Sequence, residues 1–184
     1  MKKEQILKAA LQLLAVRGLH AITFADIAKE ANVGIGTIYR YFSGKEDLII
    51  QVWIEQKKRE AEYVFKGYKI NGTIRQRFNF LCGRVITYLS ERPLEFQFSY
   101  HFASSPILGK SVHKLAMKEF LPMDKLYEDG LTQDIFKPMK PQHLRLFTLG
   151  TINGWLLWSL AEKPSFNNKT RQQFLQMIWD ALAK

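Results

Sequence analysis

The sequence predicts an all-α fold, and three observations support this class. Apolar side chains recur at helical spacing through most of the 184 residues, and strong turn signals separate the apolar segments. Only residues 94–102 alternate apolar and polar side chains with the period of a β-strand. No second stretch of this kind is available to pair with them, and an unpaired strand is unstable, so we expect these residues to be helical as well.

The first two predicted helices have clear ends. Residues 2–17 place their apolar side chains on one stripe, and Gly18 follows as a residue that commonly ends helices. Thr23 is followed three residues later by an acid, a variant of the capping box that begins a helix. This second helix extends only to about Ala31, because Asn32-Val33-Gly34 has the composition of a turn.

A third short helix is expected to begin at Ile35 or Gly36 and to end at Phe42. Ser43-Gly44-Lys45-Glu46 follows, which we interpret as a second capping box that begins a longer amphipathic helix ending near Phe65. Two short helices joined by a turn and flanked by longer helices have the pattern of a helix-turn-helix.

The rest of the chain is also predicted to be helical, with Pro122 causing a kink or break in one helix. We expect helices over about residues 73–92, from Pro106 or Gly109 to about Gly130, over residues 142–161 and over about residues 167–182, with a loop at residues 134–141.

Composition and charge restrict the classes of protein. Hydrophobic residues make up 47% and charged residues 24% of the chain, the balance of an ordinary globular protein. The formal charge of +10 suggests an anionic partner, with nucleic acid as the first candidate. Residues 1–45 hold seven Lys or Arg against three Asp or Glu, whereas residues 46–184 hold twenty against fourteen. The positive charge is therefore denser near the N-terminus.

No segment predicts a membrane span or a secretory leader. The longest nearly uncharged apolar stretch, residues 149–161, is shorter than the roughly 18 residues that a membrane span needs. Charged and polar residues interrupt residues 2–17, unlike the apolar region of a signal peptide. The single cysteine, Cys82, cannot form an internal disulfide, which agrees with a reducing compartment. We therefore expect a cytoplasmic protein without membrane association.

Residues 6–53, with the sequence ILKAALQLLAVRGLHAITFADIAKEANVGIGTIYRYFSGKEDLIIQVW, resemble the DNA-binding domain of the tetracycline-repressor-like (TetR) family of transcriptional regulators. The most diagnostic segment is GTIYRYFSGKEDL, residues 36–48. The resemblance covers about a quarter of the chain and implies binding to double-stranded operator DNA.

The resemblance also implies a division into two domains. A helix-turn-helix domain is expected at residues 1–45, and a helical effector-binding and dimerisation domain at residues 46–184. A helix over about residues 45–65 links the two domains, and helices within about residues 142–183 form the dimer interface.

In this family the third helix enters the major groove and its neighbours bind phosphates. By similarity, the candidate DNA-binding residues are Thr23, Gly34, Gly36, Thr37, Tyr39, Arg40, Tyr41 and Lys45. Arg40 suits pairing with O6 and N7 of guanine, whereas Tyr39 and Tyr41 suit phosphate oxygens. Structural alternatives remain: Arg40 as a phosphate contact or an ordinary surface residue, Gly34 as a turn residue, and Tyr41 as a residue packed partly under the helix.

The resemblance implies that a small ligand bound in the C-terminal domain of a homodimer changes the spacing of the two recognition helices and releases DNA. Candidate ligand contacts, which suit a hydrophobic or aromatic effector, are Phe78, Cys82, Phe98, Phe102, Trp155 and Trp158. Candidate dimer contacts are Gly150, Gly154, Leu156, Phe174 and Ile178. The alternative is that these residues belong to the core, which is the more common place for aromatic residues at helical spacing.

No pattern predicts an enzyme, a cofactor or a metal site. The four histidines lack metal-ligand spacing, Cys82 lies in apolar surroundings, and no glycine-rich phosphate loop is present. We therefore expect a ligand-responsive transcriptional regulator, most simply a repressor that binds a palindromic operator as a dimer. The alternative is an architectural DNA-binding protein whose DNA affinity does not respond to an effector.

Overall fold

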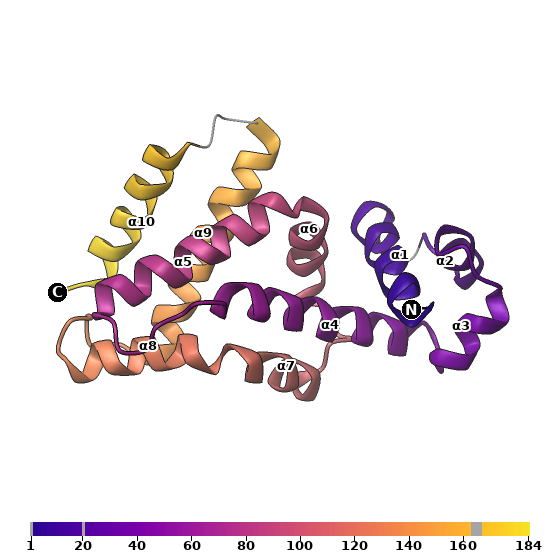
Figure 1. Cartoon of the computed structure of the whole chain (residues 1–184), viewed down its shortest axis with the longest axis horizontal. Helices are drawn as coiled ribbons and strands as arrows, with labels where there is room; N and C mark the ends of the chain where they lie inside the picture. The colour runs from indigo at the N-terminus through magenta and orange to yellow at the C-terminus, as the bar shows by residue number, and fades with distance from the viewer. Residues whose placement is uncertain (1, 20, 163–166) are drawn as a thin grey trace. The chain divides into compact units, whose positions relative to one another are not determined.

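The computed structural model describes residues 2–19, 21–162 and 167–184, which form helices joined by short connections (Figure 1). The helices are α1 (Lys2–Arg17), α2 (Phe24–Glu30), α3 (Ile35–Tyr41), α4 (Lys45–Phe65), α5 (Ile74–Glu91), α6 (Pro93–Phe102), α7 (Lys110–Met117), the 3₁₀ turn η1 (Lys118–Phe120), α8 (Leu121–Thr132), α9 (Pro141–Glu162) and α10 (Asn168–Leu182). The predicted all-α class is confirmed. Among the described residues, β-type pairing is limited to an isolated bridge between Phe136 and Ala183.

Most predicted helix ends agree with the structure. Gly18 has a φ of 74° and Asn32 a φ of 51°, the left-handed conformations expected where α1 and α2 end. The alternating stretch is indeed helical, as α6. The break predicted at Pro122 is found as η1, after which Pro122 occupies the first turn of α8.

The capping interaction at the start of α4 differs from the prediction. The backbone N–H and the hydroxyl of Ser43 both donate to Oδ2 of Asp47, at 2.9 and 3.1 Å, whereas the predicted partner was Glu46. Gln51 donates to the other carboxylate oxygen of Asp47 at 2.8 Å. The hydrogen bonds from Gln51 and from Ser43 lower the pKa of Asp47. A carboxylate one residue later than expected therefore fixes the start of α4.

The described helices group into two compact units. Unit 1 contains Met1–Arg59 and Arg92–Lys118, and unit 2 contains Glu60–Glu91 and Glu119–Lys184. The domain boundary predicted between residues 45 and 46 falls inside unit 1. The reason is that α4 continues the core of unit 1 with Leu48, Ile49, Val52 and Trp53, all of them buried.

Unit 1 is built on α1, which contacts α2, α3 and α6. Its largest fully buried side chain is Trp53 of α4, whose ring lies against Phe98 of α6 and, edge-on, against His113 of α7. Beside them, Ser99 donates a hydrogen bond of 2.9 Å to the buried side chain of Gln56. The helix-turn-helix region therefore shares one core with α4, which follows it directly, and with α6, which lies about 50 residues further along the chain.

Unit 2 is built on α5, which contacts α8, α9 and α10. The C-terminus is held by backbone hydrogen bonds, because Lys137 N donates to Leu182 O at 2.9 Å and Lys184 N donates to Ile135 O at 3.0 Å. In the part of the chain that the structure describes, no helix is long and apolar enough to cross a membrane.

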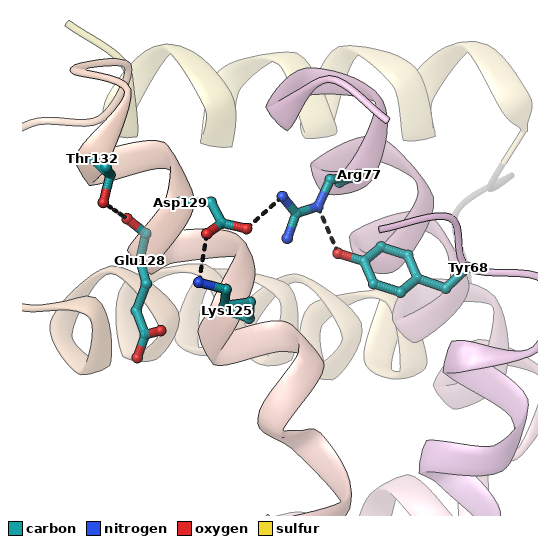
Figure 2. Close-up of polar contacts among 6 residues, drawn as sticks. All are labelled: Tyr68, Arg77, Lys125, Glu128, Asp129 and Thr132. Carbon is teal, nitrogen blue, oxygen red and sulfur yellow. Dashed lines mark hydrogen bonds and ion pairs between the residues drawn. The ribbon is translucent and has the colours of Figure 1, made fainter. Parts of the chain in front are cut away.

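A buried arginine joins α5 to α8 in unit 2 (Figure 2). Only 4% of the Arg77 side chain is exposed, and its Nη1 donates to Oδ2 of Asp129 at 2.7 Å. Its Nε donates to the hydroxyl of Tyr68 at 2.8 Å, and Lys125 donates to the second oxygen of Asp129 at 2.9 Å. Two cations thus share one carboxylate, and of the three groups only Arg77 is buried, because the Lys125 side chain is 54% exposed and that of Asp129 22% exposed.

The charges in this site stabilise the ionised form of each partner. The hydrogen bond from Lys125 lowers the pKa of Asp129; burial opposes this effect and the contact with Arg77 adds to it. Burial disfavours charged Arg77, but its hydrogen bonds to Tyr68 and Asp129 outweigh burial and raise its pKa. Because the pKa of Asp129 is lower in the folded chain, its contribution to stability is present at neutral pH and is lost as the pH falls through that lowered pKa.

We expect Asp129→Asn to lower the free energy of unfolding by about 3 kcal/mol, because it leaves the buried Arg77 charge without its carboxylate. Urea denaturation followed by circular dichroism measures this loss. Asp134→Asn is the matched control, since the Asp134 side chain is 81% exposed and its ion pair with Lys184 lies at the surface. Equal effects of the two substitutions would show that Arg77 does not depend on Asp129.

Candidate nucleic-acid interface

The turn between α2 and α3 is set by backbone hydrogen bonds. Ala31 ends α2, Asn32 takes a left-handed conformation, and Val33 N donates to Ala28 O at 2.9 Å. Gly34 is the N-cap of α3 and accepts a 2.8 Å hydrogen bond from Thr37 N through its carbonyl oxygen. The predicted helix-turn-helix is therefore present, with a short and internally bonded turn.

Thr23 begins α2 through a complete capping box, as predicted. Its hydroxyl accepts from Asp26 N at 3.2 Å and donates to Oδ2 of Asp26 at 2.6 Å, and its own N–H donates to the same oxygen at 2.8 Å. The hydrogen bonds from the Thr23 side chain and backbone lower the pKa of Asp26. Thr23 is thus exposed and fixed in place at the start of the helix that precedes α3.

The two faces of α3 have different roles. Ile38 and the following Phe42 are fully buried in the unit 1 core. Tyr39 points outward with 62% of its surface exposed, and the edge of its ring contacts Phe24 of α2 at a centroid distance of 5.1 Å. Packing therefore anchors α3 through its apolar face and supports an aromatic hydroxyl on its outer face.

Arg40 and Tyr41 contact each other at the end of α3. The Arg40 guanidinium carbon lies 5.1 Å from the centre of the Tyr41 ring, a cation–π distance, and Nη2 approaches the Tyr41 hydroxyl at 3.5 Å. Arg40 is exposed, whereas Tyr41 is half-buried and its ring also lies near that of Phe42. Tyr41 therefore packs partly under the helix, and its ring orients the guanidinium above it.

Gly36 is a glycine that the fold itself does not require. A Cβ atom at Gly36 would meet no other atom within 4 Å. Gly130 of α8 is the opposite case, because a Cβ there would lie 2.4 Å from the Phe136 ring. The absence of a side chain at Gly36, and likewise at Gly34, leaves open surface that a molecule outside the chain can approach.

Lys45 has a structural contact that the sequence does not reveal. Its ammonium donates a 2.6 Å hydrogen bond to the carbonyl oxygen of Ile22, the residue before the Thr23 cap. An ammonium has three donors, so two directions remain for a phosphate. Lys45 therefore ties the first turn of α4 to the start of α2, and its contact with a phosphate stays a prediction.

The six predicted effector contacts do not form one cluster within either unit. Phe98 and Phe102 belong to the core of unit 1, whereas Phe78 and Cys82 are buried in unit 2. Burial raises the pKa of the Cys82 thiol well above its ordinary value. Of the two remaining candidates, Trp155 stacks on Phe174 at 5.0 Å and Trp158 is 51% exposed. The predicted aromatic residues thus include three core phenylalanines and two tryptophans with accessible surface.

Two predicted dimer contacts are core residues of unit 2. Leu156 and Ile178 are only 3% and 2% exposed, because they point into the interior of the unit. The outward face of α9 is instead lined by exposed Gly150 and Gly154, together with apolar residues that the prediction missed. These missed residues are Leu146, Phe147, Trp158 and Leu160. They were overlooked because apolar residues cover nearly the whole circumference of α9, so its pattern does not distinguish the two faces.

A helix-turn-helix with an outward aromatic and cationic face, carried by an all-α chain, defines the helix-turn-helix class of transcription regulators. Residues 6–52 match the family described as bacterial regulatory proteins, tetR family, and residues 73–183 match a tetracyclin repressor-like C-terminal domain. The chain belongs to the tetR family. Members of this family regulate transcription and are not enzymes, in agreement with the prediction from the sequence.

Known relatives agree with this membership. The fatty acid metabolism regulator protein of Bacillus subtilis (strain 168) is 32% identical over 89 residues, which cover 48% of this chain and 46% of that protein. The chain thus spans less than half the length of this curated relative.

Solved structures show the same fold. A TetR family transcription regulator from Marinobacter aquaeolei VT8 superimposes with a TM-score of 0.91 at 20% identity, covering 100% of this chain and 96% of that one. The transcriptional regulator FadR from Bacillus subtilis, in complex with stearoyl-CoA, has a TM-score of 0.75 at 21% identity, covering 95% and 96%.

Gly36→Ala tests whether the open surface on α3 is a binding surface. The substitution meets no atom of the chain, so we expect the free energy of unfolding to stay the same or rise by up to about 1 kcal/mol. DNA affinity, measured by fluorescence anisotropy, should nevertheless fall several-fold, because the added methyl group prevents the DNA from coming close to the backbone of α3. Gly109→Ala is the control, as this exposed glycine is equally unobstructed but lies outside the helix-turn-helix. Unchanged affinity in Gly36→Ala would exclude a close approach of DNA at this position.

Proposed function

We propose that this protein is a ligand-responsive transcriptional repressor that binds a palindromic operator as a homodimer and is released by a small hydrophobic effector. The observation that carries the proposal is the outer face of α3, where Tyr39 and Arg40 stand beside the unobstructed Gly36. An aromatic hydroxyl, a guanidinium and bare backbone are the groups expected on a helix that enters the major groove.

The distribution of charge favours double-stranded DNA as the partner. The chain carries a formal charge of +10, and the positive charge is densest in residues 1–45. Such a charge attracts the phosphate backbone and accelerates encounter without selecting a sequence. Arg40 and Thr37 then supply the contacts by which one sequence is preferred, while Tyr39 positions the helix on a phosphate. Because the partner is genomic DNA, we place the protein in the cytoplasm.

The outer face of α9 is the proposed dimer interface. Leu146 is 70% exposed, Phe147 48% and Trp158 51%, and the two exposed glycines of this helix lie on the same stripe. An apolar surface of this kind usually marks an interaction site, and the absence of side chains at Gly150 and Gly154 permits close helix approach. The proposed dimer contacts are therefore Leu146, Phe147 and Trp158, and no longer the buried Leu156 and Ile178.

A hydrophobic effector is supported by the chemistry of the chain and by its relatives. Trp155 keeps exposed surface and is the accessible candidate, because Trp158 is assigned to the dimer interface. A ligand could contact Phe78 or Cys82 only if the unit 2 core opened. FadR from Bacillus subtilis was solved with stearoyl-CoA, so a long-chain acyl-CoA is the first effector to test. An effector that binds the DNA-incompetent conformation more tightly shifts the population away from DNA, typically by about 1–3 kcal/mol of coupling.

Sequencing genomic fragments that the purified protein selects tests the proposed function. A shared palindrome among the bound fragments is the expected result, and addition of stearoyl-CoA should release the protein from that site. Salt-sensitive binding without a shared sequence, or binding indifferent to all acyl-CoAs and hydrophobic compounds tested, would instead favour the architectural alternative.

Arg40→Ala is expected to relax the preference at one position of the operator half-site. If the guanidinium pairs with guanine, the difference between guanine and other bases there should fall by about 1–3 kcal/mol. Competition binding with a set of singly substituted operators measures this difference. Lys29→Ala removes the same charge from the exposed surface of α2 and should leave the relative affinities unchanged. Identical preferences for Arg40→Ala and the wild type would assign Arg40 to phosphate or to the solvent.

Phe147→Glu should dissociate the homodimer without unfolding the chain. Phe147 is exposed, so the charge is tolerated in the monomer but is buried unpaired in the interface, weakening association by about 30-fold or more. Light scattering over a range of protein concentrations gives the mass.

The control for this substitution is Met139→Glu, because Met139 is an exposed apolar residue of unit 2 outside α9 and α10. Leu156→Glu should instead unfold unit 2, since Leu156 is in its core. A folded Phe147→Glu protein that remains dimeric at low concentration would remove this face of α9 from the interface.

A further inference from the structure

One exposed apolar residue of α3 has no role in the proposed function described so far. Ile35, the first residue of the helix, is 46% exposed. It lies four residues before Tyr39, so both residues occupy the same face of the helix, whereas Ile38 turns into the core. Ile35 is therefore an aliphatic side chain on the outward face, which otherwise presents hydroxyl, phenol and guanidinium groups.

The surroundings of Ile35 leave its side chain accessible. It is 46% exposed, and the residues on either side of it, Gly34 and Gly36, carry no side chain that could cover it. A single exposed isoleucine is common on protein surfaces and by itself indicates nothing. Its position is what distinguishes it, because this isoleucine lies between two glycines at the start of α3, on the face that carries Tyr39.

We propose that Ile35 is a specificity-determining residue that contacts the C5-methyl group of a thymine in the major groove. This inference rests on the proposed function. An isoleucine side chain can neither donate nor accept a hydrogen bond, so it reads a base only through apolar contact. Among the base edges of the major groove, the thymine methyl is the apolar group. Ile35 thus selects thymine by burial of a methyl group, while Arg40 reads the base edge by hydrogen bonding.

Deoxyuridine provides a direct test, because it pairs like thymidine but lacks the C5-methyl group. The operator obtained by fragment selection is synthesised with each thymidine replaced in turn by deoxyuridine, and affinities are measured by fluorescence anisotropy. We expect one position per half-site at which the wild type loses about fourfold in affinity for each methyl removed, and about 15-fold when both half-sites are changed.

Variants separate this contact from effects of the methyl group on DNA shape. Ile35→Ala and Ile35→Gln should bind the thymidine operator more weakly than the wild type and should bind the thymidine and deoxyuridine forms equally at that position. Because no phosphate contact is lost, both variants should keep the wild-type dependence of affinity on salt. Val16→Ala is the control, since Val16 is 70% exposed but belongs to α1 and not to α2, α3 or the turn between them, and it should retain the full discrimination.

The outcomes distinguish this inference from the proposed function. A palindromic operator at which no deoxyuridine substitution weakens wild-type binding overturns the role of Ile35 and leaves the repressor proposal intact. A deoxyuridine effect of equal size in the wild type and in both Ile35 variants also overturns it, because the methyl group then acts through the DNA. Absence of any sequence-specific binding overturns the proposed function and this inference together.

Discussion

The burial of one face of α3 is the constraint on which the rest of the helix-turn-helix depends. The helix has only seven residues, whereas isolated helices shorter than about 12 residues are unstable in water. Its hydrogen bonds alone cannot maintain it. Ile38 and Phe42 are 0% and 1% exposed, and this burial in the unit 1 core holds the helix together. The outer residues are consequently free to vary in chemistry, because stability is supplied from the opposite face.

The two units use different means to hold their helices together. Unit 1 relies mainly on a continuous apolar core, in which Trp53 and Phe98 contact each other across α4 and α6. In unit 2, the buried Arg77 adds a charged junction between α5 and α8, with Asp129 as its carboxylate partner. An apolar contact tolerates small shifts, but a buried charge without its partner costs several kcal/mol. Separation of α5 from α8 at this junction is therefore more costly than the loss of one apolar contact.

Local chemistry explains which features could be predicted from the sequence. The end of α1 follows from Gly18, and the start and end of α2 follow from Thr23 and Asn32, because the conformational preferences of these residues act within a few positions. The helical state of residues 94–102 was predictable because their strand-like alternation has no partner strand. The choice of Asp47 over Glu46 at the start of α4 depends on side-chain geometry, which spacing alone does not determine.

Contacts between residues far apart in the sequence explain which features could not be predicted. The ammonium of Lys45 reaches Ile22 across 23 positions, and the guanidinium of Arg77 reaches Asp129 across 52, so no local pattern contains either pair. Because apolar residues surround nearly all of α9, the sequence does not show which side of the helix faces the core, and Leu156 was predicted to face outward although it is buried. Cys82 is fully buried in unit 2, and its position makes it a probe of the stability of that core. Cys82 is the only thiol in the chain, and alkylating reagents cannot reach it until the unit 2 core opens. The rate at which it is alkylated therefore reports how often that core opens in the native protein.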